Sequence, residues 1–207
     1  VTRLDRQGEK LSETVFDAEN LKFMAHHLDR EGNLYVALYH QGVLTVTPPN
    51  SLPFSTADTT TNQSMLVKLS PVGAVLWFKP LTGDANVIAA GIAVNPLVTG
   101  EKFVAVSGWF KGQLHGSIGG EEALGNSEDG FVSYFKEGES EVTFQRTVAF
   151  NADYNNRITG VAAHPDGSFW ITGWREADMT AQQGGLSEDL ILEGDDSEGM
   201  PYAFVAS

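Results

Sequence analysis

The feature that most constrains this chain is a repeat of about 65 to 70 residues, because such a period indicates an array of similar structural units. One module of the repeat is a short apolar strand, a turn with Gly, and a second strand that ends in an aromatic residue. Three copies of this module occur, at residues 25–39, 91–109 and 160–174. When Leu34, Val104 and Phe169 are taken as equivalent, the copies lie 70 and 65 residues apart.

A second module follows each copy of the first. Residues 65–77 contain it as Met-Leu-Val-Lys-Leu, a turn with Pro and Gly, and Val-Leu-Trp, and residues 131–144 match this pattern. Residues 204–207 begin a further copy, and residues 1–11 align with the part of the module that starts at Leu66. We therefore expect the chain to start inside one repeat and to end at nearly the same point three periods later.

Each module has two short runs rich in Val, Ile, Leu and aromatic residues, joined by Gly, Pro, Asp or Asn, which is typical of a β-hairpin. Two hairpins give four antiparallel strands per period, which is the content of one β-propeller blade. The best helical window, Ser12–Lys22, lies between modules and has no convincing helical period. A solenoid fits the period poorly, because its units need only ~20–50 residues. An array of β-sandwiches is therefore the main alternative to a propeller.

We therefore predict an all-β fold, a β-propeller built of four-stranded antiparallel blades, with about three blades in residues 1–207. The repeat boundaries are expected at 1–22 (the end of a blade), 23–86, 87–154 and 155–207. Propeller rings close with roughly 4–8 blades, so three blades would leave two apolar sheet faces bare. Either further blades of the same chain or identical chains in a homo-oligomer are expected to complete the ring.

Composition limits the classes of partner. The chain has 27 Asp and Glu against 13 Lys and Arg, which gives a net charge of −14. This charge would repel a phosphate backbone, so we expect neither a nucleic-acid partner nor an anionic membrane surface. The sequence has no run of ~18 apolar residues, the length of a membrane span. Because it has no Cys, disulfides and thiolate chemistry are excluded.

The repeat resembles the SBBP family, a bacterial β-propeller repeat. The resemblance rests on Gly91-Ile-Ala-Val-Asn95, Ile171-Thr-Gly-Trp174, Phe131-Val-Ser133 and Val67-Lys-Leu-Ser-Pro-Val-Gly73, and it extends over nearly the whole chain. The first copy departs from the pattern, with Ala-His-His-Leu where the family has Gly-Ile-Ala-Val. The resemblance implies a scaffold that is exported or lies on the cell surface, and it brings no shared catalytic residues.

Catalytic motifs are missing from the sequence. There is no Gly-x-Ser-x-Gly elbow and no Walker-type phosphate loop. The five His residues have no metal-ligand spacing, and His26 and His27 would point to opposite faces of one strand. We therefore predict a protein that is not an enzyme. An enzyme whose active site lies at the ring axis, a hydrolase or lyase only partly contained in this chain, is the alternative.

An acidic segment, residues 187–198, holds six carboxylates and a Gly. Calcium takes six to eight oxygen ligands, often from a loop that bends at Gly. Asp195, Asp196 and Glu198 are the candidate Ca²⁺ ligands, although the spaced Asp-x-Asp-x-Asp pattern is missing. The other interpretation is a solvated acidic loop that keeps the protein soluble and needs no cofactor.

Aromatic residues end the second strand of each repeat: Tyr39, Trp109 and Trp174. If they are exposed, these rings are candidates for stacking on a sugar or a peptide side chain. The alternative is that they fill the wedge between adjacent blades.

Long connections differ in length and composition among the repeats, at 41–63, 110–128 and 175–201. Variable loops on a rigid frame are typical of a binding surface. We therefore predict a non-enzymatic, extracellular or cell-surface scaffold that binds a protein or glycan partner, or mediates assembly. Besides the axial enzyme, a calcium-stabilised secreted module is a second alternative to this scaffold.

Overall fold

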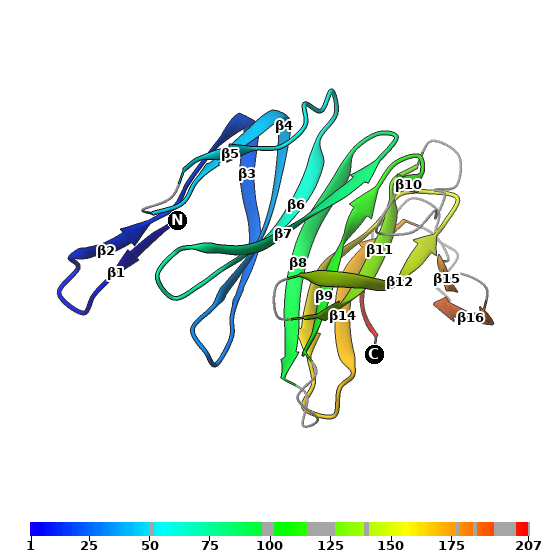
Figure 1. Ribbon diagram of the computed structural model, residues 1–207. Coiled ribbons are helices and arrows are strands. Elements are labelled where there is room, and N and C mark those ends of the chain that lie inside the picture. The colour runs from blue at the N-terminus through cyan, green and yellow to red at the C-terminus, as the bar shows by residue number, and fades with distance from the viewer. Residues whose placement is uncertain are drawn as a thin grey trace.

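The computed structural model describes residues 1–49, 52–96, 102–115, 127–138, 141–176, 179–183, 186–192 and 202–206. In this part of the chain every regular element is a strand, and neighbouring strands run antiparallel (Figure 1). The prediction of an all-β fold without helices is confirmed. The strands form open sheets, and the described strands do not close into a barrel.

The first sheet follows the N-terminal hairpin of β1 (Thr2–Leu4) and β2 (Lys10–Glu13). Its strand order is β10-β7-β6-β4-β3, with β5 paired to β4. The bounds are β3 (Val15–Leu28), β4 (Leu34–Thr47), β5 (Phe54–Ser55), β6 (Gln63–Leu69), β7 (Val75–Gly83) and β10 (Leu114–His115).

The second and third sheets follow in chain order. The second has the order β16-β15-β12-β11-β9-β8, and the third has the order β13-β14-β17. The bounds are β8 (Val87–Pro96), β9 (Lys102–Phe110), β11 (Asp129–Glu137), β12 (Val142–Asn151), β13 (Asn156–Ala163), β14 (Phe169–Arg175), β15 (Met179–Gln183), β16 (Leu186–Leu192) and β17 (Tyr202–Ala206).

The sequence suggested that the connections are simple loops, but the structure shows strands within them. Strand β4 continues to Thr47, and the short strands β5 and β10 lie in the connections expected at 41–63 and 110–128. The third connection supplies β15 and β16, which extend the second sheet. These segments pair with a neighbouring edge because a sheet edge offers free backbone donors and acceptors.

The same pairing register recurs in all three sheets. A β-bulge interrupts the first strand pair between Phe23 and Ala25, between Ala89 and Gly91, and between Ile158 and Gly160. Beyond each bulge, Ala25, Gly91 and Gly160 face Ala37, Ser107 and Thr172. A bulge adds twist at a fixed point, so the three sheets twist at equivalent positions.

The hairpin turns also repeat. In the turns of β1–β2, β3–β4, β6–β7 and β13–β14 the N–H of a Gly bonds to the carbonyl three residues before it, and Gly73, for example, bonds to Ser70 at 2.9 Å. Gly73 has φ of +85°, which L-residues with a side chain rarely adopt. Gly8 in the N-terminal hairpin has φ of +87° and the equivalent bond to Asp5. This hairpin therefore has the turn of β6–β7.

The sheets follow one another through the molecule in chain order (Figure 1). Their first strands are in contact in the order β3, β8 and β13. We call these three the inner strands. A large apolar core between the first and second sheets includes Leu66, Trp77, Val106 and Phe131. A smaller core between the second and third sheets includes Phe150 and Ile158.

The outer face of the first sheet is not bare, contrary to the expectation for an open stack. Val36 and Val67 on this face are 2% and 1% exposed. Phe16 and Val46, from the far ends of β3 and β4, pack in the same cluster, and Phe54 of β5 borders it. The long strands β3 and β4 therefore cover part of this face, which the sequence analysis expected a neighbouring blade to cover.

Candidate functional site

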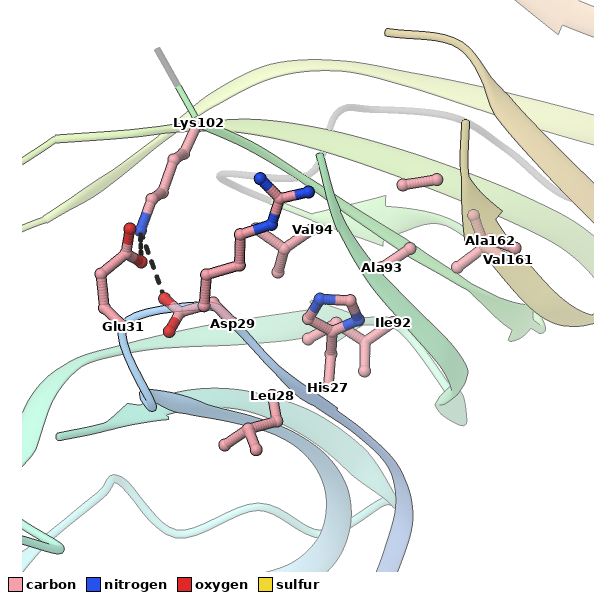
Figure 2. Close-up of a pocket in the computed structure, with 12 residues that line it drawn as sticks. His27, Leu28, Asp29, Glu31, Ile92, Ala93, Val94, Lys102, Val161 and Ala162 are labelled. Carbon is pink, nitrogen blue, oxygen red and sulfur yellow. Dashed lines mark hydrogen bonds and ion pairs between the residues drawn. The ribbon is translucent and has the colours of Figure 1, made fainter. Parts of the chain in front are cut away.

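A cleft of about 470 Å³ opens where the β3–β4 turn meets inner strands β8 and β13. Figure 2 shows its charged rim, with Asp29 and Glu31 from the turn facing Lys102 from the start of β9. The apolar wall comes from the inner strands. Its lining residues are Leu28, Ile92, Ala93, Val94, Val161, Ala162 and Ala163.

Gly91 allows the inner strands β8 and β13 to approach closely beside this cleft. A Cβ at this position would lie 3.0 Å from the backbone nitrogen of Val161 and 2.5 Å from Ser107 Oγ. Both separations are shorter than ordinary contacts, so a side chain here would push the strands apart. The Gly of the Gly-Ile-Ala-Val pattern is therefore explained by the packing of β8 against β13 beside the cleft.

Asp29 is fixed by its own turn. Its Oδ1 accepts a bond of 2.8 Å from the Asn33 backbone, and its Oδ2 accepts one of 2.9 Å from the Asn33 side chain. Burial would raise the pKa of Asp29, but the bonds from Asn33 and Lys102 outweigh it and lower the pKa to about 2. Asp29 is therefore ionised at neutral pH, and its lone pairs are largely committed.

Lys102 joins the two carboxylates of the turn to the second sheet. Its Nζ lies 3.2 Å from Asp29 Oδ2 and forms an ion pair with Glu31. Burial would lower the pKa of Lys102, but the two acidic partners raise it. His27 lies across the cleft (Figure 2), and there burial lowers the pKa of the imidazole. The rim therefore contains one charged lysine, two carboxylates and a neutral histidine at pH 7.

A buried polar network lies behind the rim, between the first and second sheets. The Glu137 side chain is 4% exposed and accepts bonds from Lys68 Nζ at 2.5 Å and from Trp77 Nε1 at 2.9 Å. The Tyr35 hydroxyl donates to Glu137 at 2.6 Å and lies 3.4 Å from Asp29 Oδ2. One buried carboxylate of the second sheet thus binds three side chains of the first.

Three charged groups of the cleft are poorly suited to proton transfer. Asp29 and Glu31 both pair with Lys102, and the shifts in the pKa of Asp29 and of Lys102 move both groups away from neutrality. A general acid or base works best with a pKa near the working pH. Arg30 is exposed at the rim and forms no ion pair with any described residue, so it is available to a ligand.

The aromatic candidates occupy equivalent positions. Tyr39, Trp109 and Trp174 are each half-buried and lie opposite Ser64, Gly130 and Ala203 of the third strand. They do not line the cleft.

Two of these rings stack on one cation. The Arg157 guanidinium lies 4.5 Å from the centre of the Trp109 ring and 5.3 Å from that of Trp174. Its Nε also donates to Glu128 at 2.6 Å. Arg157 therefore joins the second and third sheets, and it covers one face of each ring. Tyr39 is in contact with Lys22 in a similar way, at 5.6 Å.

The proposed calcium ligands Asp195, Asp196 and Glu198 lie outside the described residues. Within the part of the chain that the structure describes, no group of three His, Asp or Glu side chains is placed to hold a metal ion.

Sequence reasoning missed two kinds of residue. The first is the Lys68–Glu137 pair, which are 69 residues apart in the chain. The second is a pair of asparagines in the links between sheets. The side-chain oxygen of Asn86 accepts from the Asn62 backbone at 3.3 Å, and that of Asn155 accepts from the Glu128 backbone at 3.0 Å. The sequence signal for these asparagines was that Asn86 and Asn155 hold equivalent positions in the repeat, just before the first strand of a sheet.

No protein-family model matches this chain, and no curated protein matches it in sequence. The described residues include no helix with the length and apolar character of a membrane span. The site is therefore interpreted from its own geometry.

Proposed function

We propose that this chain is part of a non-enzymatic β-propeller scaffold that binds a protein or glycan partner through the connections between its strands. The blades in this proposal are residues 23–86, 87–154 and 155–207, after the end of a preceding blade at 1–22. The observation that carries it is the order of the inner strands. Strands β3, β8 and β13 are the first strands of successive sheets and touch one another in sequence, as strands around a propeller axis do.

The links between sheets support this arrangement because they repeat atom for atom. Val87 N bonds to Asn62 O at 2.9 Å, and Asn156 N bonds to Glu128 O at 2.8 Å. These four residues hold equivalent positions in two successive links. A side chain at the start of the third strand accepts a backbone N–H at the end of the fourth strand in both: Gln63 from Gly83, and Asp129 from Ala152. Identical links would set equal rotations between blades.

A binding role is favoured by how the polar side chains are used. The ion pairs at the cleft rim and the Glu137 network join the sheets to each other, which makes the frame rigid. The three repeats of this chain differ most in the length and composition of their connections. Rigid frames with variable connections commonly carry recognition sites. From the resemblance to the bacterial repeat family we propose that this scaffold acts outside the cell or on its surface.

An axial enzyme is the second candidate, because titratable side chains do converge in the cleft. His27, Asp29, Glu31 and Lys102 line it together. The pairing of Asp29 and Glu31 with Lys102 argues against a catalytic role for these three, but a substrate would compete for those pairs.

An array of bacterial and host glycans would test both candidates. The chain is compared with a variant whose residues 57–61 are replaced by Gly and Ser at equal length. The proposal predicts a bound glycan whose retention falls at least tenfold in the variant while the melting temperature stays unchanged. Mass spectrometry of the same array detects cleavage. A glycan that is cleaved by the wild type but not by Lys102→Met would contradict the proposal and establish the enzyme.

A further inference from the structure

The second and third long connections both turn back to the sheet that precedes their own. Strand β10, which follows β9 of the second sheet, pairs with β7 of the first sheet. Strand β15, which follows β14 of the third sheet, pairs with β12 of the second sheet. We call these segments the first strap, residues 111–115, and the second strap, residues 179–183. Each strap joins its own sheet to the sheet before it.

The two straps meet the preceding sheet at the same point of the repeat. The register between the third and fourth strands makes Thr82 of β7 equivalent to Asn151 of β12. Thr82 pairs with His115 of the first strap, and Asn151 pairs with Thr180 of the second. Attachment at one position in two successive sheets indicates a device that belongs to the repeat.

The first strap is closely fitted to the first sheet. Its Leu114 is fully buried and belongs to the apolar core between the first and second sheets. The Gln113 carbonyl accepts the N–H of Asp84 at 2.9 Å. A Cβ at Gly83 would lie 2.6 Å from the same carbonyl oxygen. Glycine at the end of β7 therefore allows the strap to approach this closely.

A second glycine sets the direction of the first strap. Gly112 has φ of +75°, a conformation that residues with a side chain rarely adopt. A Cβ at this position would lie 3.2 Å from the Cβ of Asp84, which is tighter than an ordinary contact. The chain therefore leaves the end of β9 through one glycine and reaches β7 beside another.

The first strap joins the two sheets on the side away from the inner strands. Strands β3 and β8 already contact each other at the inner side, whereas β7 is the fourth strand of the first sheet when counted from β3. The coupling between neighbouring units of a repeat protein depends on the contacts at their shared interface. A second attachment at the far end of the interface therefore opposes separation of the sheets.

We propose that the straps couple successive sheets, so that each sheet unfolds together with the sheet before it. The start of a long connection then serves the frame, and residues 111–115 are not part of a recognition surface. This inference goes beyond the proposed function, because the coupling holds whatever partner the scaffold binds.

Pulsed hydrogen–deuterium exchange along a urea series measures the coupling. Peptides from β4 and β6 report on the first sheet, and peptides from β9 and β11 report on the second. In the wild type, both sets of peptides are expected to have one unfolding midpoint. In Gly112→Val the two midpoints are expected to separate by at least about 0.5 M urea, because a β-branched residue strongly disfavours a positive φ.

Gly8→Val is the matched control. Gly8 has φ of +87° in the turn of the N-terminal hairpin, and a Cβ there would have no neighbour within 4 Å. The substitution therefore introduces the same backbone strain away from the strap. The midpoints of the first and second sheets should stay together in this variant.

A disulfide across the first strap tests whether its attachment causes the coupling. The chain has no Cys, and Thr82 and His115 lie opposite each other in register. Antiparallel partners have Cα atoms about 4.5–5.5 Å apart, a separation that a disulfide can span. In Gly112→Val/Thr82→Cys/His115→Cys, the oxidised protein should again have one midpoint, and reduction should separate the two midpoints.

Four results would overturn the proposal: separate midpoints in the wild type, one shared midpoint in Gly112→Val, an equal separation in Gly8→Val, or an oxidised disulfide that leaves the midpoints apart. If Gly112→Val does not fold, Gly112→Ala takes its place. Alanine is also strained at a positive φ, so the same separation and the same rescue by the disulfide are expected.

Discussion

Replacement of Glu137 by Gln is expected to destabilise the protein strongly. The change leaves the Lys68 ammonium, on a side chain that is 10% exposed, without a charge partner. Removing one member of a buried ion pair costs about 3–5 kcal/mol, a large part of the roughly 5–15 kcal/mol that holds a typical domain folded. For a chain of this length, each kcal/mol corresponds to ~2–4 °C. We therefore expect the melting temperature to fall by about 10 °C.

Urea unfolding, followed by tryptophan fluorescence, measures this cost. The double variant Lys68→Met/Glu137→Gln removes both charges and keeps an amide that can bond to Trp77 and Tyr35. It should be within about 1 kcal/mol of the wild type, because a paired buried charge gains little over uncharged packing. Glu13→Gln is the exposed control, since Glu13 pairs with Lys10 in solvent, and it should leave the midpoint unchanged. A single variant as stable as the wild type, or a double variant less stable than the single one, would refute the reasoning.

Three further predictions concern stability. The pKa of Asp29 is lowered to about 2 from 3.8, so ionised Asp29 stabilises the folded protein above about pH 4, and this stabilisation is lost as the pH falls from about 4 to about 2. The unfolding free energy of the wild type should drop in that window relative to that of Asp29→Asn. Parallel plots of unfolding free energy against pH for the two proteins would contradict this. Gly108→Ala should lower the free energy of unfolding by about 2 kcal/mol or more in a thermal melt, because a Cβ there would lie 2.0 Å from the carbonyl oxygen of Ile88. Gly138→Ala is the control and should have little effect, because a Cβ there would lie 3.4 Å from its nearest neighbour. Arg157→Met should cost about 1–2 kcal/mol in urea, through the lost stacking on two Trp rings, and an unchanged urea midpoint would count against that contact.

Much of the fold could be predicted because strand and turn chemistry is local. Gly in the turns, Val and Ile in the runs, and one aromatic at each strand end are enough to locate the hairpins. The sequence alignment that made Tyr39, Trp109 and Trp174 equivalent agrees with their register in the sheets. The extra strands in the connections could not be predicted, because pairing at a sheet edge depends on which edge lies nearby.

The candidate site was much harder to predict. Its charged groups come from a turn after β3 and from the start of β9, and only the packing of two sheets brings Asp29 and Lys102 together. The structure pairs both Asp29 and Glu31 with this lysine of the second sheet. Arg157 likewise decides how Trp109 and Trp174 are used, because it stacks on both rings.

We propose that the inner strands of successive sheets lie against one another around one axis. The most direct test is a nuclear Overhauser effect between an α-proton of Gly91 on β8 and the amide proton of Val161 on β13, since a Cβ at Gly91 would lie 3.0 Å from that nitrogen. The account predicts a strong cross-peak there. Its absence, in a spectrum that contains the cross-peaks within each sheet, would contradict the propeller arrangement.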